Sequence, residues 1–190
     1  MSCLVITELE DDLINRSSLA TIKAASQIDK DIDIIVLNRS SCDKAKNIKN
    51  IKNVIFIDSK IENMCAENLS NMLVGISKNY SHILAPSGTF SKDIMPRLSA
   101  LLDTQQISDI IKVIDADTYQ RPIYAGNAIA TVKSLDEKKV ITVRSTAFVA
   151  EDVEGGDAKV IEAPKLKTDD PTVYIEEVWV IGVLPYSTPP

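Results

Sequence analysis

The chain has 190 residues with a net charge of −6 at pH 7, an isoelectric point near 4.9, three cysteines and one histidine. A domain of this size buries roughly 70% of the surface that its unfolded chain exposes, so it can build a full core without disulfides or metals. The acidic balance argues against nucleic acid as a partner, because such binding draws its affinity from Lys and Arg that displace counterions.

Apolar, β-rich runs alternate with amphipathic helical patterns over the first hundred residues. The runs are nearly continuous in apolar residues, which is typical of parallel strands covered on both faces by crossover helices. The pattern predicts a three-layer α/β/α sandwich of Rossmann-like type. A break or kink is expected at Pro96, because proline disrupts a helix interior. The expected strands are 4–8, 32–37, 53–58 and 82–85, and the expected helices are 15–28, 43–51, 66–78 and 90–102.

After residue 102 the pattern changes to strands without helices between them. Strands this close together are most easily joined antiparallel, because a parallel connection needs a crossover of a dozen or more residues. We therefore expect antiparallel strands added at one edge of the parallel core sheet. The expected strands are 107–114, 119–124, 128–133 and 139–144.

The composition shifts again at residues 151–157, which are acidic and contain Gly155 and Gly156. Such a stretch is typical of a linker. The sequence predicts a domain over residues 1–150, followed by a linker and tail over residues 151–190. The tail has two β-prone pieces, 159–162 and 172–184, and its aromatic residues Tyr174 and Trp179 are expected to pack rather than to stack on a flavin.

The termini and cysteines bear on location. No apolar run reaches the ~20 residues that a membrane-spanning helix needs, so membrane insertion is not expected. The chain enters an apolar strand with no basic leader before it, which favours the cytoplasm of a bacterium, or the mitochondrial matrix for a processed form. Cys3, Cys42 and Cys65 are far apart without Cys-x-x-Cys spacing, so we expect buried, inert thiols and no metal site.

The stretch formed by residues 108–111 and 118–133 carries more aromatic, Arg, Gly and Asn positions than a generic strand requires, and with its neighbouring segments it points to one family. Five segments carry the resemblance. They resemble the N-terminal domain of the alpha subunit of electron transfer flavoprotein, whose fold is of the adenine nucleotide alpha hydrolase-like type. The resemblance covers roughly residues 1–148 and does not extend beyond Asp169. The segments are 81–85 (SHILA), 91–98 (SKDIMPRL), 107–111 (ISDII), 121–127 (RPIYAGN) and 142–148 (TVRSTAF).

The resemblance implies an electron carrier rather than an enzyme. Members pair an alpha with a beta subunit, accept electrons from acyl-CoA and related dehydrogenases of fatty acid beta-oxidation, and pass them to a membrane oxidoreductase of the respiratory chain. The FAD lies mainly on the C-terminal domain of alpha, and AMP lies in beta. The family's flavin-binding Ser-Gly-Gly-Arg-Gly segment is absent from residues 177–184. We therefore expect a truncated alpha subunit whose N-terminal domain is a scaffold, with no FAD bound to this chain alone.

The turn Ser87, Gly88 and Thr89 opens a helix and is a weak candidate for an anion site. A small-residue turn at a helix N-terminus can bind phosphate through its backbone N–H groups. Serine or threonine at such a place is first a helix cap, and neither a Walker A pattern nor G-x-G-x-x-G is present. If this turn does bind phosphate, the alternative function is that of a free-standing adenine-nucleotide-binding module. A further alternative is an inactive truncated fragment.

Three arginines are candidates for partner contacts: Arg97, Arg121 and Arg144. Each has an alternative interpretation as half of a local salt bridge. His82, the only histidine, is expected to be a hydrogen-bonded edge residue at the start of a strand. Asp109 has no matching nucleophile and base, so the sequence predicts no catalytic residue.

Overall fold

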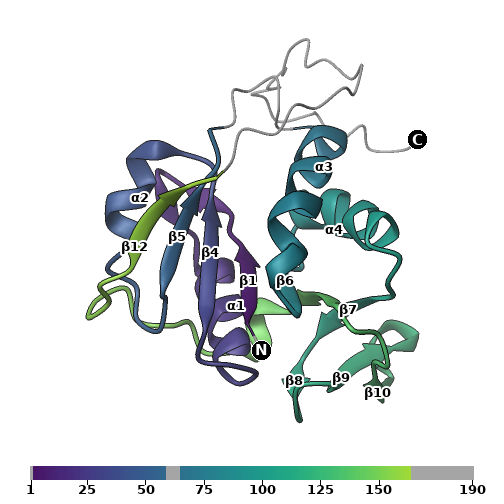
Figure 1. Cartoon of the computed structure of the whole chain (residues 1–190). Coiled ribbons are helices and arrows are strands. Elements are labelled where there is room, and N and C mark those ends of the chain that lie inside the picture. Colours follow the sequence, from purple (N-terminus) through teal and green to yellow (C-terminus); the bar gives the residue numbers. More distant parts are fainter. Residues whose placement is uncertain (1, 59–64, 164–190) are drawn as a thin grey trace, which may run out of the picture.

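The computed structural model describes residues 2–58 and 65–163, with a seven-stranded sheet at its centre (Figure 1). All strand pairs in this sheet are parallel, in the order β12-β5-β4-β1-β6-β11-β7. The predicted parallel core is confirmed. The strands are β1 (Cys3–Ile6), β4 (Ile32–Val36), β5 (Asn53–Phe56), β6 (His82–Pro86), β7 (Gln106–Ile110), β11 (Lys139–Val143) and β12 (Lys159–Glu162).

Helices cover both faces of this sheet. Helices α1 (Arg16–Ser26) and α2 (Arg39–Ala45) contribute to one buried apolar cluster, and α3 (Ala66–Ile76) and α4 (Thr89–Leu101) contribute to the other. Within β1, Val5 belongs to the first cluster and Leu4 to the second, because successive side chains of a strand point to opposite faces. The three-layer α/β/α sandwich is therefore confirmed.

Local sequence explains where the helices begin. The Asn15 side chain caps α1 by accepting a hydrogen bond from the Ser18 N–H at 2.8 Å. Asn38 caps α2 in the same way, so this helix begins at Arg39, earlier than the predicted start at residue 43. Of the expected break or kink at Pro96, the break does not occur, since α4 continues through it to Leu101.

The antiparallel strands form a separate sheet rather than an edge of the central one. Strands β8 (Lys112–Val113), β9 (Thr118–Ile123) and β10 (Ala128–Lys133) pair antiparallel, and β11 returns between β6 and β7 as a parallel strand. The three strands serve as the long crossover that a parallel connection requires. The turn between β9 and β10 contains left-handed residues at Tyr124, Ala125 and Gly126. A two-stranded hairpin, β2 (Leu9–Glu10) and β3 (Leu13–Ile14), follows β1.

The tail that follows the expected linker contributes a strand to the central sheet. Strand β12 pairs with β5, and two backbone bonds lead into it, from Gly156 N–H to the Asn47 carbonyl at 2.8 Å and from Ala158 N–H to the Lys46 carbonyl at 2.9 Å. The buried Glu151 carboxylate lies 3.4 Å from Lys23 Nζ. The predicted β-prone piece 159–162 is thus a strand. The second predicted piece, 172–184, lies outside the described residues, as do Tyr174 and Trp179.

Candidate functional site

The chain order of the central sheet reverses between β1 and β6. From β1 the sheet continues to β4 on one side and to β6 on the other. Open α/β sheets bind ligands at such a switch point, outside the carboxyl ends of the strands. Glu8 follows β1 here, and the turn from Ser87 to Thr89 follows β6 and leads into α4. This edge is therefore the candidate site.

The start of α4 is faced by a carboxylate of the chain itself. Gly88 is the N-cap of the helix and, having no side chain, provides no side-chain capping hydrogen bond. Glu8 Oε1 accepts a hydrogen bond from Ser91 Oγ at 2.8 Å, and Glu8 Oε2 lies 3.4 Å from Asn15 Nδ2. A Cβ at Gly88 would lie only 2.7 and 2.8 Å from the two Glu8 carboxylate oxygens. The predicted anion turn thus already has an anion beside it, one that the sequence interpretation missed.

Arg144 and Asp109 form an ion pair at the neighbouring ends of β11 and β7. Arg144 donates from Nε to Asp109 Oδ2 at 2.9 Å, and its Nη2 contacts the same oxygen. Asp109 has a left-handed backbone, and its N–H donates to Thr142 Oγ1 at 2.9 Å. The Arg144 hydrogen bonds, with smaller contributions from Ser87 and Lys92, hold the pKa of Asp109 below its usual range. The lowered pKa favours the ionised form of Asp109, which is the partner of Arg144.

The three candidate arginines lie on three different elements. Arg97 is exposed on α4, Arg121 is half-buried on β9, and Arg144 follows β11 and is paired with Asp109. The intramolecular pair is the local salt bridge that was one of the two interpretations of Arg144. A role of these residues at a partner interface remains a prediction.

Arg121 borders a recess of about 340 Å³ between β7 and the strand β10. Its Nε is buried and makes no hydrogen bond within the described part of the chain, and the same holds for Oε1 of Gln106. Burying a donor or acceptor without a partner is costly, at about 1–3 kcal/mol each. Gln106 was missed by sequence reasoning, because nothing in its local pattern signals burial. The recess is lined by Gln105, Gln106, Ile107, Arg121, Val132, Lys133, Ser134, Leu135 and Asp136.

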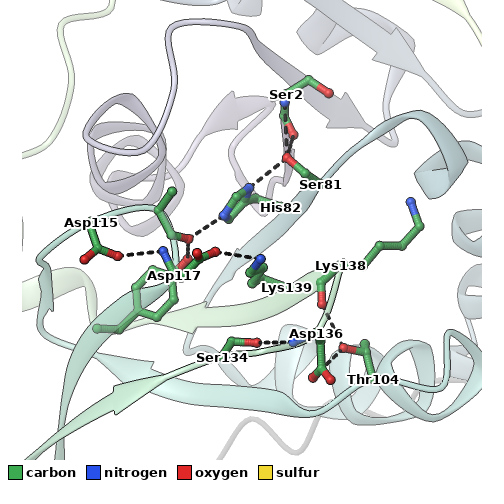
Figure 2. A network of polar contacts seen from close by, with 12 residues as sticks. Ser2, Ser81, His82, Thr104, Asp115, Asp117, Ser134, Asp136, Lys138 and Lys139 are labelled. Carbon is green, nitrogen blue, oxygen red and sulfur yellow. Dashed lines mark hydrogen bonds and ion pairs between the residues drawn. The ribbon is translucent and has the colours of Figure 1, made fainter.

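A polar network fixes the antiparallel sheet to the amino end of β6 (Figure 2). His82 Nε2 lies 2.7 Å from the Ala116 carbonyl, which can only accept, so Nε2 carries a hydrogen. His82 Nδ1 lies 2.9 Å from Ser81 Oγ. Burial is the main cause that lowers the pKa of His82, so its neutral form is favoured. The predicted hydrogen bonding of His82 at a strand start is confirmed by these contacts, but the expected edge position is wrong, because β6 lies between β1 and β11 in the sheet.

Two lysines extend this network along the same end of the sheet (Figure 2). Lys139, buried in β11, pairs with Asp117 at 2.7 Å. Lys138 Nζ donates to three backbone carbonyls at the end of α3, those of Ser77, Lys78 and Tyr80, at 2.8–3.0 Å. Both contacts join segments far apart in sequence. The Lys139–Asp117 pair links β11 to the residue before β9, and the Lys138 contacts link the start of β11 to the segment after α3.

Other reactive groups are few. Within residues 2–58 and 65–163, no three His, Cys, Asp or Glu side chains gather in a way that could hold a metal ion. Cys3 and Cys42 are buried, and burial raises the pKa of the Cys3 thiol to about 12, whereas Cys65 is half-buried. None of the described helices is long and apolar enough to cross a membrane.

Comparison with known proteins gives the family. The model of the electron transfer flavoprotein domain matches residues 3–169. The chain belongs to the electron transfer flavoprotein family. An electron transfer flavoprotein subunit alpha from Pseudomonas aeruginosa is 42% identical over 164 residues, which cover 84% of this chain and 53% of that protein. The mitochondrial subunit alpha of Dictyostelium discoideum is 41% identical over 174 residues, covering 85% of this chain and 49% of that protein.

A probable mitochondrial subunit alpha from Saccharomyces cerevisiae is 32% identical over 194 residues, covering 97% of this chain and 56% of that protein. The chain thus spans about half the length of the curated relatives it matches. The predicted resemblance to the N-terminal domain of an electron transfer flavoprotein alpha subunit is confirmed.

Proposed function

We propose that this chain is the N-terminal scaffold domain of an electron transfer flavoprotein alpha subunit. With a beta subunit and FAD, the complete protein shuttles electrons from acyl-CoA and related dehydrogenases to a membrane oxidoreductase of the respiratory chain. The chain acts as part of an electron carrier rather than as an enzyme, in a bacterial cytoplasm or a mitochondrial matrix. The family match over residues 3–169 and the subunit names of the relatives support this role.

The carboxylate of Glu8 at the switch point is the observation that favours a scaffold over a cofactor domain. FAD carries a pyrophosphate, and a helix N-terminus is the usual place for it. In this chain a carboxylate faces that place, so the described residues do not fit a flavin dinucleotide at α4. We assign FAD to the rest of the complete protein. The same observation weighs against a free-standing nucleotide-binding module.

Arg121 is the first choice for a contact with the beta subunit. Its buried Nε and the nearby Gln106 Oε1 lack partners within the described residues, and both border the recess beside β7. A polypeptide of the partner offers carbonyl and N–H groups that would satisfy both atoms. Arg97 on α4 is the second choice. Arg144 is the third, because its guanidinium already binds Asp109.

Calorimetric titration of the cognate beta subunit with this chain tests the proposal. The wild-type chain should bind. Charge reversal in Arg121→Glu should weaken binding at least tenfold, since it removes a desolvated donor and adds repulsion. Arg97→Glu reports on α4, and Arg16→Glu, an exposed arginine on α1, is the matched control that should bind like the wild type.

Each variant must keep the melting transition of the wild type for its binding to be interpreted. A folded wild-type chain that does not bind beta contradicts the scaffold proposal. Wild-type binding that none of the variants weakens leaves the scaffold standing and refutes the assignment of the interface to these arginines.

A further inference from the structure

The Glu8 carboxylate is held in place by several contacts rather than projecting freely. The Glu8 N–H donates to Ser18 Oγ at 2.8 Å, and its carbonyl accepts from the Asn15 N–H at 3.0 Å. The short β2–β3 hairpin lies between Glu8 and Asn15 in the chain. It turns at two left-handed residues, Asp11 and Asp12, as a tight two-residue hairpin requires. The backbone of Glu8 is therefore fixed on both sides, and its side chain reaches Ser91 in α4.

Gly88 makes room for this carboxylate. Its backbone angles, φ −86° and ψ 174°, are ones that any residue adopts, so glycine is not required there for conformational reasons. What glycine provides is space, because a Cβ would lie 2.7 Å from Glu8 Oε1. Ser91, in the first turn of α4, adds a hydroxyl that donates to the same oxygen. Space, a hydroxyl donor and the positive end of a helix thus converge on one negative group.

Those three features also characterise a phosphate subsite. Ligands of open α/β sheets bind at the carboxyl ends of the strands where the chain order reverses, with phosphate at a helix N-terminus. In this chain, the start of α4 beside the ends of β1 and β6 meets that description. The anion found there comes from the protein.

We propose that Glu8 is an internal anion that occupies the phosphate position at the N-terminus of α4 and thereby prevents this domain from binding a nucleotide at its switch point. A phosphate arriving there would lie within a few ångströms of a carboxylate, and the two negative charges would repel each other. It would also have to displace the Ser91 and Asn15 contacts. Binding of a beta subunit is not needed for this role of Glu8.

The test removes the carboxylate and asks whether phosphate takes its place. Glu8→Ala is compared with the wild type and with Glu10→Ala, which removes the same charge from an exposed position in β2. Inorganic phosphate and AMP are titrated separately, and the amide NMR signals of residues 88–91 are followed. Glu8→Ala should show saturable shifts there, with phosphate affinity at least about tenfold above that of the wild type and of Glu10→Ala.

Tighter binding of AMP than of phosphate by Glu8→Ala extends the site to the nucleoside, and equal binding limits it to the anion; both outcomes support the proposal. Saturable shifts at residues 88–91 in the wild type overturn it, as does a Glu8→Ala variant whose signals do not move. If Glu8→Ala does not melt cooperatively, Glu8→Ser replaces it, because the smaller hydroxyl leaves a hydrogen-bonding group beside Ser91 and Asn15. For Glu8→Ser, saturable shifts at residues 88–91 support the proposal, and signals that do not move overturn it.

Discussion

Tyr119 joins the antiparallel sheet to the core, and its replacement measures how strongly the two are coupled. It is fully buried in β9, opposite Val132 of β10, and belongs to the same apolar cluster as Cys3 of β1. Its hydroxyl donates to the Ala116 carbonyl. Tyr119→Phe removes only this bond, and Ala116 keeps its His82 donor, so we expect a loss of about 0.5–1.5 kcal/mol.

Tyr119→Ala removes the ring as well and should cost about 3–5 kcal/mol, as for other buried aromatic side chains. For a domain of this size that corresponds to a fall of about 6–20 °C in the melting midpoint. The assay is urea unfolding followed by far-UV circular dichroism, with melting curves in parallel. Tyr124→Ala is the matched control, because the Tyr124 side chain is 79% exposed, and it should change stability by less than about 0.5 kcal/mol. Equal losses for Tyr119→Ala and Tyr124→Ala would refute the reasoning.

Three further predictions concern pH and backbone space. Burial lowers the pKa of His82 in the folded chain below its ordinary value of 6.5, so His82 of the unfolded chain is protonated first as the pH falls. The contribution of His82 to stability should therefore be full above pH 6.5 and be lost as the pH falls through the pKa of the folded chain. Melts between pH 8 and 5 should show this slope for the wild type and not for His82→Gln. Gly156→Ala should destabilise more than Gly155→Ala in urea unfolding, since its Cβ would lie 2.1 Å from a backbone carbonyl whereas Gly155 offers open space and only a left-handed φ of 93°. The stability losses of Asp109→Asn and Arg144→Gln should be non-additive in a double-mutant cycle at pH 7. They should become additive as the pH falls below 3.8 and through the lowered pKa of Asp109 in the folded chain, because the carboxylate is then protonated. Additive losses at pH 7 would mean that the pair is not coupled.

The local pattern of the sequence was sufficient for the parallel core. Strands β1, β4, β5 and β6 are short apolar runs, and α3 has a regular apolar face, so composition and periodicity identify them. The position of β11 was not predictable in this way. Strand β11 pairs with β6 and β7 because the chain leaves the central sheet after β7, forms the separate sheet of β8, β9 and β10, and then returns. The spacing of strands along the sequence does not reveal which sheet a strand joins.

The site depended still more on long-range contacts. The sequence identified the turn at Gly88 from its small residues before a helix, and it identified Arg144 within a segment that resembles the family. It did not identify Glu8, because the contact between Glu8 and Ser91 joins residues 83 positions apart. Gln106 was missed for a similar reason: its burial depends on β9 and β10 packing beside β7, which no local pattern records.

Sedimentation velocity of this chain mixed with its cognate beta subunit tests the scaffold role most directly. We expect a single faster species with one copy of each polypeptide, formed without added nucleotide. When beta is omitted, this chain should sediment alone as a folded species. Two independently sedimenting, folded polypeptides at concentrations well above those of typical subunit affinities would contradict it.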